Sequence, residues 1–381
     1  RISRDDMQSL ALATSRLRRL PTALRRGFTT TPCGTTTHPL IDISPLFDDG
    51  DSPERAAAVS SIGAAMRTRG YFYCVNVDAL PADYIASVYE YSRRLHSLPL
   101  DVKKAFSQRG SGSYTGEDIG EAELEYEVGV KSSARAWDYS RTMFSLGTAA
   151  ARYPAADVIE PPFEAVLGEL YERQNTLARG LLGAFGEALG LPRSTFVEMF
   201  EHEHLGTVRL IHYPGRPTDG APAAEKGIGA HTDFEAFTLM HQDAPGLQFM
   251  PRQGEGVLEW VDAPVRRGEF VVIVGDMLER FTNGTWRATP HRVLQTDAPR
   301  SSIIRFNAVA PQTVVEPLSH FVSDAQPPLY SPVTMQTHME TTMRNIDAGL
   351  GAWDDEAQRS TTASYLYIDG RDHRLVERES A

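Results

Sequence analysis

The stretch that decides the fold is GAHTDFEAFTLMHQDAPGLQF, residues 229–249, which places His231 and Asp233 two positions apart, ahead of an apolar run. In an extended strand, side chains at positions i and i+2 point to the same side. We therefore expect a strand to start at His231 and to present an imidazole nitrogen and a carboxylate oxygen to one metal ion. Such a pair is common at solvent-facing positions, so it predicts a metal site only if a third ligand exists.

A third ligand is available further along the chain. His291 lies in TWRATPHRVL, a strand-like run that follows the turn residues Asn283 and Gly284. Two histidines and one carboxylate form the facial triad that leaves open positions on non-haem Fe(II). His291 taken alone would be interpreted as an ordinary strand-edge histidine, so the triad needs support from its surroundings.

That support comes from RSSIIRF, which begins nine residues after His291. Strand alternation places Arg300 and Ser302 on one face of this run. A guanidinium beside a hydroxyl suits a carboxylate, which the guanidinium can bind through two hydrogen bonds. Tyr213, in RLIHYP, could add a phenol hydroxyl from the neighbouring strand.

The predicted secondary structure changes at residue 207, from mixed helices and strands to strands. Before it, helical patterns at 53–69 and 161–190 accompany apolar strand-like runs at 39–47 and 71–77. After it, short strand-like runs separated by Gly, Pro, Asn and Asp predict a β-sandwich or barrel. These runs are TVRLIHY, AFTLMHQ, GLQFM, VLEWV, EFVVIVG, TWRATPHRVL and SSIIRFNAV.

Residues 207–309 resemble the core of the isopenicillin N synthase-like 2-oxoglutarate/Fe(II) dioxygenases. The matching pieces there are RLIHYP, the opening stretch, GDMLERFTNGTWRATPHRV and RSSIIRF, and PLIDISPLF, RGYFYCVNV and LPLDVKKAF resemble the leading part of the family. The resemblance implies a mainly β fold with α: a double-stranded β-helix, or jelly-roll barrel, with an N-terminal α/β portion and flanking helices.

The chain is expected to divide into four regions. We expect a basic extension over 1–38, a dioxygenase-type α/β region over 39–200, the barrel over 201–350 and a tail over 351–381. A helical pattern near 334–348 closes the barrel region, whereas residues 107–160 show little regular pattern.

The resemblance also implies an activity and its site. The chain would be an Fe(II)- and 2-oxoglutarate-dependent oxygenase that oxidises a small organic molecule with O2 while 2-oxoglutarate becomes succinate and CO2, with ascorbate as a candidate reductant. His231, Asp233 and His291 would bind the iron, and the 2-oxoglutarate-binding residues would be Arg300, Ser302 and Tyr213. This sequence departs from the family's usual pattern at His212, where Asn is frequent, and at 76–78, where NVD replaces Asn-His-Gly.

Two other functions stay open. The chain could resemble isopenicillin N synthase or aminocyclopropanecarboxylate oxidase, which use no 2-oxoglutarate, or it could be a non-catalytic barrel that binds a metal or a small carboxylate.

Four further features are less specific. We interpret His202, Glu203 and His204 as a solvated turn and the acidic run 116–127 as a solvated loop, with a lid as its alternative. His241 could face either side of its strand, and Phe306 shares the face of Arg300, where it belongs to the core or lines the pocket.

Charge and composition limit the partners. The formal net charge is −12, and residues 1–38 carry +5, which leaves −17 for the rest of the chain. An acidic body argues against nucleic acid, which favours basic surfaces. No run approaches about 18 apolar residues, so we expect no membrane span, and we expect a monomer that binds a small molecule.

The N-terminal segment bears on location. It is rich in Arg, Ser and Thr and, from Met7, contains no acid, which is typical of organellar transit segments. The whole chain has two cysteines, Cys33 and Cys74, which suits a reducing compartment. We expect a cytoplasmic protein, with mitochondrial or other organellar targeting by residues 1–38 as the close alternative.

Overall fold

The computed structural model describes residues 38–48, 50–106, 114–115, 133–140, 153–201, 206–216, 226–251, 259–347, 353–354 and 359–360. From His38 onward the chain belongs to one compact unit. Residues 1–37 of the predicted basic extension (1–38) and most of the predicted C-terminal tail (351–381) lie outside the described residues. Among the described helices, none is long and apolar enough to cross a membrane.

Two β-sheets form the centre of this unit. The large sheet has eight strands in the order β1-β2-β10-β7-β12-β5-β4-β3, and the small sheet has four in the order β6-β11-β8-β9. Neighbouring strands are antiparallel except β1 and β2. The large-sheet strands are β1 Leu40–Asp42, β2 Tyr71–Val75, β3 Tyr114–Thr115, β4 Arg135–Ser140, β5 Thr207–Tyr213, β7 Phe237–Gln242, β10 Phe270–Val274 and β12 Arg300–Asn307, and the small-sheet strands are β6 Lys226–His231, β8 Leu247–Phe249, β9 Val261–Asp262 and β11 His291–Leu294.

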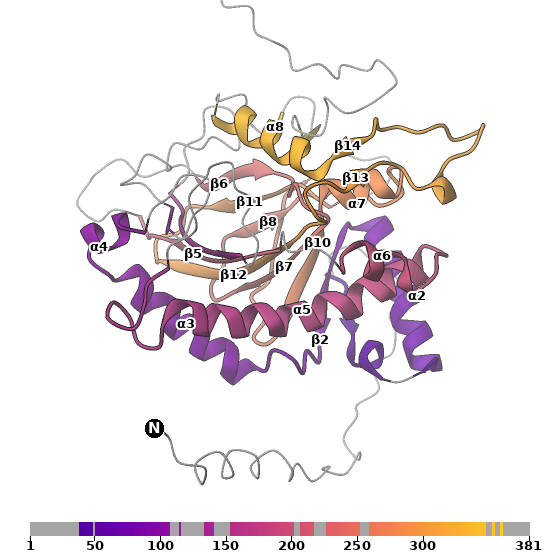
Figure 1. The fold of residues 1–381 in the computed structure, drawn as a ribbon. Coiled ribbons are helices and arrows are strands. Elements are labelled where there is room, and N and C mark those ends of the chain that lie inside the picture. Colours follow the sequence, from indigo (N-terminus) through magenta and orange to yellow (C-terminus); the bar gives the residue numbers. More distant parts are fainter. Residues whose placement is uncertain are drawn as a thin grey trace, which may run out of the picture. The chain divides into compact units, whose positions relative to one another are not determined.

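Helices cover one face of the large sheet, and Figure 1 shows the long helix α5 running across it. The helices are α2 Pro53–Thr68, α3 Ala82–His96, α4 Leu100–Lys104, α5 Phe163–Ala188, α6 Ser194–Met199, α7 Asp276–Phe281 and α8 Met335–Asp347. The short remaining elements are η1 Ser44–Phe47, η3 Ser319–Phe321, β13 Val314–Val315, β14 Val333–Thr334, β15 Trp353–Asp354 and β16 Arg359–Ser360.

Alternation along the strands separates two hydrophobic clusters. In β12, Ile303 belongs to the cluster that contains the helices, whereas Ile304 belongs to a cluster that joins both sheets. The second cluster marks the barrel interior, because it combines residues such as Ile211 of the large sheet with Val293 of the small sheet. Period-two alternation then places Arg300 and Ser302 on the interior side with Ile304.

The structure confirms most predicted elements. Six of the seven predicted strand-like runs after residue 207 contain a strand, and the seventh, VLEWV, overlaps β9 only at Val261. The helices expected at 53–69, 161–190 and 334–348 are α2, α5 and α8. Strands β1 and β2 lie in the same sheet as the barrel strands, because β2 pairs with β10.

Several predictions about elements were wrong or incomplete. His231 ends strand β6 and does not start a strand. The pattern did not predict β6 or α7, nor β3 and β4, which lie within the 107–160 segment. The β6 sequence KGIGAH has one large apolar residue, so it lacks the usual strand signal. Gly227 is required by packing, since a Cβ there would lie 2.8 Å from the Tyr213 ring.

The contact between α5 and the large sheet contributes to the stability of the unit. Phe185 is fully buried, and its ring lies edge-on to Phe237 of β7 at 5.2 Å and to Trp286 at 5.5 Å. We expect Phe185→Ala to lower the free energy of unfolding by about 3–5 kcal/mol, measured by urea denaturation, because it removes this packing and leaves a cavity. Val314→Ala, at a side chain that is 49% exposed, is the control and should change it by less than about 0.5 kcal/mol. Equal effects of the two substitutions would contradict this account.

Candidate metal centre

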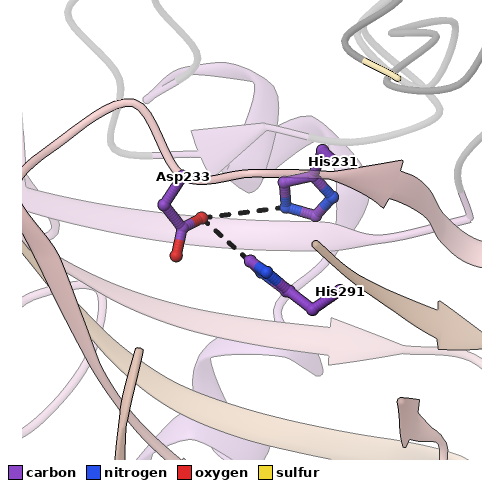
Figure 2. A group of neighbouring side chains, drawn as sticks. All are labelled: His231, Asp233 and His291. Carbon is purple, nitrogen blue, oxygen red and sulfur yellow. Dashed lines mark ion pairs between the residues drawn. The ribbon is translucent and has the colours of Figure 1, made fainter. Parts of the chain in front are cut away.

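Two adjacent strands of the small sheet bring three polar side chains together. His231, the last residue of β6, pairs directly with His291, the first residue of β11, and their ring centroids are 4.3 Å apart. Asp233 follows in the connection to β7, and Figure 2 shows its carboxylate pointing at both rings. Its Oδ1 lies 3.8 Å from His231 Nε2 and 3.6 Å from His291 Nε2. The three ligand atoms lie within 4.8 Å of one another, and all three residues are buried.

Backbone carbonyls determine how the two imidazoles are oriented. The Nδ1 atom of His231 lies 2.9 Å from the Gly229 carbonyl oxygen, and that of His291 lies 3.0 Å from the Thr289 carbonyl oxygen. A carbonyl can only accept, so each Nδ1 carries the proton and each Nε2 keeps its lone pair toward Asp233. Burial, together with the neighbouring His291, lowers the pKa of His231 to about 4, which keeps that ring neutral near pH 7.

The Asp233 carboxylate is oriented by Thr238 of β7. The fully buried Thr238 hydroxyl donates a hydrogen bond to Oδ2, so that Oδ1 is the oxygen that faces the histidines. Two nitrogen lone pairs and one carboxylate oxygen therefore converge in a buried space. This donor set fits a divalent cation, and with two imidazoles and one carboxylate it fits Fe(II) in particular.

The first turn of α7 holds the loop that carries Asp233. The Asp276 amide donates to the Asp233 carbonyl at 2.9 Å, and the Met277 amide donates to the Glu235 carbonyl at 3.1 Å. The amide of Gly275, immediately before the helix, donates to a third loop carbonyl, at Ala236, at 2.9 Å. A Cβ at Gly275 would lie 2.2 Å from the Glu235 carbonyl oxygen, so only glycine allows this approach.

A second polar site lies on the interior face of β12. Arg300 is 1% exposed, and its Nη2 donates to Gln242 Oε1 and to Ser302 Oγ, both at 3.0 Å. Its guanidinium carbon lies 4.6 Å from the centre of the Tyr213 ring. No carboxylate in the described part of the chain forms a salt bridge with it, and its buried Nη1 has no hydrogen-bond partner there. A buried cation without a counterion is costly, so this pocket suits an anionic ligand such as a carboxylate.

The other histidines considered from the sequence lie elsewhere. His241 faces the helix layer, where its Nδ1 lies 2.8 Å from the Tyr89 hydroxyl and its Nε2 accepts from the Gly268 amide at 3.3 Å. His212 also faces that layer, with its ring 5.3 Å from that of His96. The histidine pair at 202–204 and the acidic run at 116–127 lie outside the described residues.

Sequence reasoning missed two groups close to the triad. Glu235 is buried, and burial together with the Asp233 charge raises its pKa to about 8, so it is largely protonated near pH 7. Arg209 of β5 forms an ion pair with Asp138 on the interior face. Arg209 could have been found from strand alternation, because it lies four residues from Tyr213 on the same strand and therefore faces the same side. Nothing in the sequence indicated Asp138, because β4 was not predicted.

Gly275 provides a test of the helix-to-loop contact. We expect Gly275→Ala to weaken divalent metal binding by more than about tenfold, because the added Cβ displaces the loop that carries Asp233. Anaerobic competition with a fluorescent Fe(II) chelator measures this affinity. Gly168→Ala in α5 is the matched control: its Cβ would meet Tyr139 at an ordinary contact of 3.4 Å, so metal affinity should not change. Wild-type affinity in Gly275→Ala would contradict the role of α7.

Thr238 provides a test of the carboxylate orientation. Thr238→Val keeps the side-chain shape but removes the donor to Asp233, so we expect metal affinity to fall by about 10- to 100-fold. Thr238→Ser keeps the hydroxyl and should retain most of the affinity in the same chelator competition. If valine and serine behave alike, the hydroxyl does not orient Asp233.

Comparisons with known proteins agree with this site. Residues 205–308 match the family model of the 2OG-Fe(II) oxygenase superfamily, and residues 38–149 match the model of the non-haem dioxygenase N-terminal region named for morphine synthesis. The 2-oxoglutarate-Fe(II) type oxidoreductase hxnY of Emericella nidulans is 26% identical over 313 residues, covering 79% of this chain and 88% of that protein. Homoarginine-6-hydroxylase 2-ODD-C23 of Glycine max is 29% identical, covering 74% and 88%.

The fold agrees as well. The crystal structure of the dioxygenase for auxin oxidation in rice superposes with a TM-score of 0.65 at 21% identity, covering 87% of this chain and 100% of that one. This likeness confirms the predicted jelly-roll fold. The two matches cover the same parts of the chain in which the sequence motifs resembled this family. The superfamily model spans all three triad residues together with Arg300 and Ser302. The chain belongs to the 2OG-Fe(II) oxygenase superfamily.

Proposed function

We propose that His231, Asp233 and His291 bind the Fe(II) of this 2-oxoglutarate-dependent oxygenase and that Arg300 binds the distal carboxylate of 2-oxoglutarate. Ser302 and Tyr213 complete the second site. One observation carries the assignment: a converging N,N,O donor set and a buried guanidinium without a carboxylate partner among the described residues lie within the same barrel. The N,N,O donor set suits a metal ion, and the guanidinium suits one carboxylate of a dicarboxylate.

The residues of the chain prepare this site before any ligand binds. The carbonyls of Gly229 and Thr289 hold both Nε2 lone pairs toward the metal position, so little reorganisation is needed on binding. Gln242 and Ser302 hold the Arg300 guanidinium in place. When bound, iron and 2-oxoglutarate supply the oxidising chemistry, in which O2 is consumed, 2-oxoglutarate becomes succinate and CO2, and the substrate is oxidised.

The apolar interior has a separate role. The cluster that joins the two sheets lies on the same face as Arg300, and its members such as Ile211 and Ile304 are buried. A low local dielectric strengthens the contact between a guanidinium and a carboxylate. Exclusion of water also protects reactive groups from side reactions. The substrate is a small molecule.

The proposed roles of Arg300 and His291 can be tested separately. We expect His291→Ala to abolish tight Fe(II) binding, whereas Arg300→Leu keeps Fe(II) affinity and weakens 2-oxoglutarate binding by more than about 30-fold, because it removes a buried charge-assisted pair. Anaerobic titration that follows the metal-to-ligand charge-transfer band of the Fe(II)–2-oxoglutarate complex measures both. Arg93→Leu, at a guanidinium that is 58% exposed on α3, is the control and should change neither.

Two results would contradict the proposal. Wild-type 2-oxoglutarate affinity in Arg300→Leu would remove the anchor assignment, and intact Fe(II) binding in His291→Ala would remove the triad. The oxidase alternative is tested by stoichiometry, because an enzyme that uses no 2-oxoglutarate turns over substrate without releasing succinate.

A further inference from the structure

Two tyrosines of β2 face the barrel interior. Tyr71 and Tyr73 belong to the hydrophobic cluster that joins the two sheets, whereas Phe72, between them, belongs to the cluster that contains the helices. Tyr71 is 2% exposed, and its ring is stacked on that of Phe249 from β8, with centroids 4.2 Å apart and planes inclined by 23°. An aromatic contact therefore links β2 to the small sheet.

The stacked pair lies beside a predicted metal ligand. Phe249 is the register partner of His291 on β11. Directly paired residues point to the same face of a sheet, with their Cβ atoms about 4.5–5.5 Å apart. The Phe249 ring is therefore next to the His291 imidazole, and Tyr71 contacts Phe249 in turn. A short chain of rings leads from the metal position to the Tyr71 phenol.

The Tyr71 hydroxyl has a basic partner at the other end of this chain of rings. It lies 2.9 Å from Nδ1 of His38, the residue before Pro39 and β1. Burial raises the pKa of Tyr71 to about 12, and burial together with the charge of Arg266 lowers the pKa of His38. A protonated phenol therefore faces a neutral imidazole. A phenol that loses an electron becomes a strong acid, so the imidazole is placed to accept its proton.

Two other tyrosines have only one of these features each. Tyr73 shares the interior face, but its hydroxyl donates to the Pro264 carbonyl oxygen at 3.3 Å, and a carbonyl does not take up a proton near pH 7. The Tyr89 hydroxyl lies 2.8 Å from His241 Nδ1, but this pair faces the helix layer. Among these three tyrosines, Tyr71 alone combines a position near a metal ligand with a basic partner.

We propose that Tyr71 is a redox-active residue that delivers an electron to the iron site when O2 and 2-oxoglutarate react there without a substrate, while His38 takes the phenol proton. The electron passes by way of Phe249 and His291, and a phenoxyl radical remains at Tyr71. This inference rests on the proposed function, because Tyr71 lies near iron only if His291 binds it.

Electrons and protons balance when ascorbate in solution restores the phenol. Reaction of 2-oxoglutarate with O2 yields succinate and CO2 and leaves one oxygen atom, with two oxidising equivalents, that a substrate would otherwise consume. Tyr71 passes one electron to this oxidant, ascorbate returns an electron to the radical, and His38 returns the proton. A second such cycle, with two protons from ascorbate in total, releases the oxygen atom as water and restores Fe(II).

Rapid-freeze EPR tests this role. Protein with Fe(II) and 2-oxoglutarate is mixed with O2 without substrate or ascorbate, after the charge-transfer band has been recorded anaerobically. We expect an organic radical whose signal narrows when the protein contains ring-deuterated tyrosine and disappears when ascorbate is added. Tyr71→Phe keeps a ring to stack on Phe249 but has no hydroxyl, so the radical should be lost. His38→Gln keeps a hydrogen-bond acceptor but not a base, and should also abolish the radical.

Two matched substitutions control for the loss of a tyrosine hydroxyl. Tyr89→Phe removes the phenol of the Tyr–His pair on the helix face, and Tyr73→Phe removes a phenol from the same interior face as Tyr71. Both should retain the radical at wild-type intensity. The charge-transfer band should form in all four variants, because none of them alters a proposed metal ligand or Arg300.

The outcomes separate the two proposals. If the band forms but the wild type gives no tyrosine radical, the role of Tyr71 is wrong and the proposed function stands. A radical that persists in Tyr71→Phe or His38→Gln, or that is lost in Tyr73→Phe or Tyr89→Phe, also overturns that role. If the band does not form in the wild type, the iron and 2-oxoglutarate assignment fails, and the role of Tyr71 fails with it.

Discussion

The site depends on one contact: backbone amides at the start of α7 hold the carbonyls of the loop after β6. This loop connects β6 to β7 and carries Asp233, and three amides from consecutive residues, Gly275 to Met277, satisfy three of its carbonyls. Buried backbone carbonyls need partners, so this loop could not otherwise be buried at low cost. Because the loop is held at this point, the aspartate meets histidines from two paired strands at a single place.

The second constraint is strand alternation in a two-faced sheet. The large sheet packs its outer face on helices and its inner face on the small sheet, so every strand distributes its residues between two environments. The outer residues hold the helices, and the inner residues provide the ligand sites. Along β12 the interior positions run from the buried Arg300 to the partly buried Phe306.

Much of this arrangement could be predicted from the sequence, because it follows from local rules. The sequence alone indicated the spacing of His231 and Asp233, the third ligand His291, and the alternation of Arg300 with Ser302. The structure brings the three predicted metal ligands together. The first pair was expected to point to one place, and it does, although its predicted secondary structure was wrong: His231 ends a strand, and Asp233 lies in a loop. The two side chains converge because of the loop contact and not because of strand alternation.

What could not be predicted depends on tertiary contacts. Thr238 is one threonine in an apolar run until β7 is placed beside Asp233, and Gly275 is an ordinary turn glycine until the Glu235 carbonyl is placed against it. Strand β6 was missed because packing against Tyr213 requires a glycine at 227, and glycine carries no strand signal. The ion pair of Arg209 with Asp138 joins segments 71 positions apart, so neither residue indicates the other.

The most direct test of the central claim is anomalous diffraction at the iron edge from crystals grown anaerobically with Fe(II) and 2-oxoglutarate. The account predicts one iron peak bound by Nε2 of His231, Nε2 of His291 and Oδ1 of Asp233, with the far carboxylate of 2-oxoglutarate on the Arg300 guanidinium. A peak elsewhere, or a 2-oxoglutarate whose far carboxylate does not contact Arg300, would contradict it.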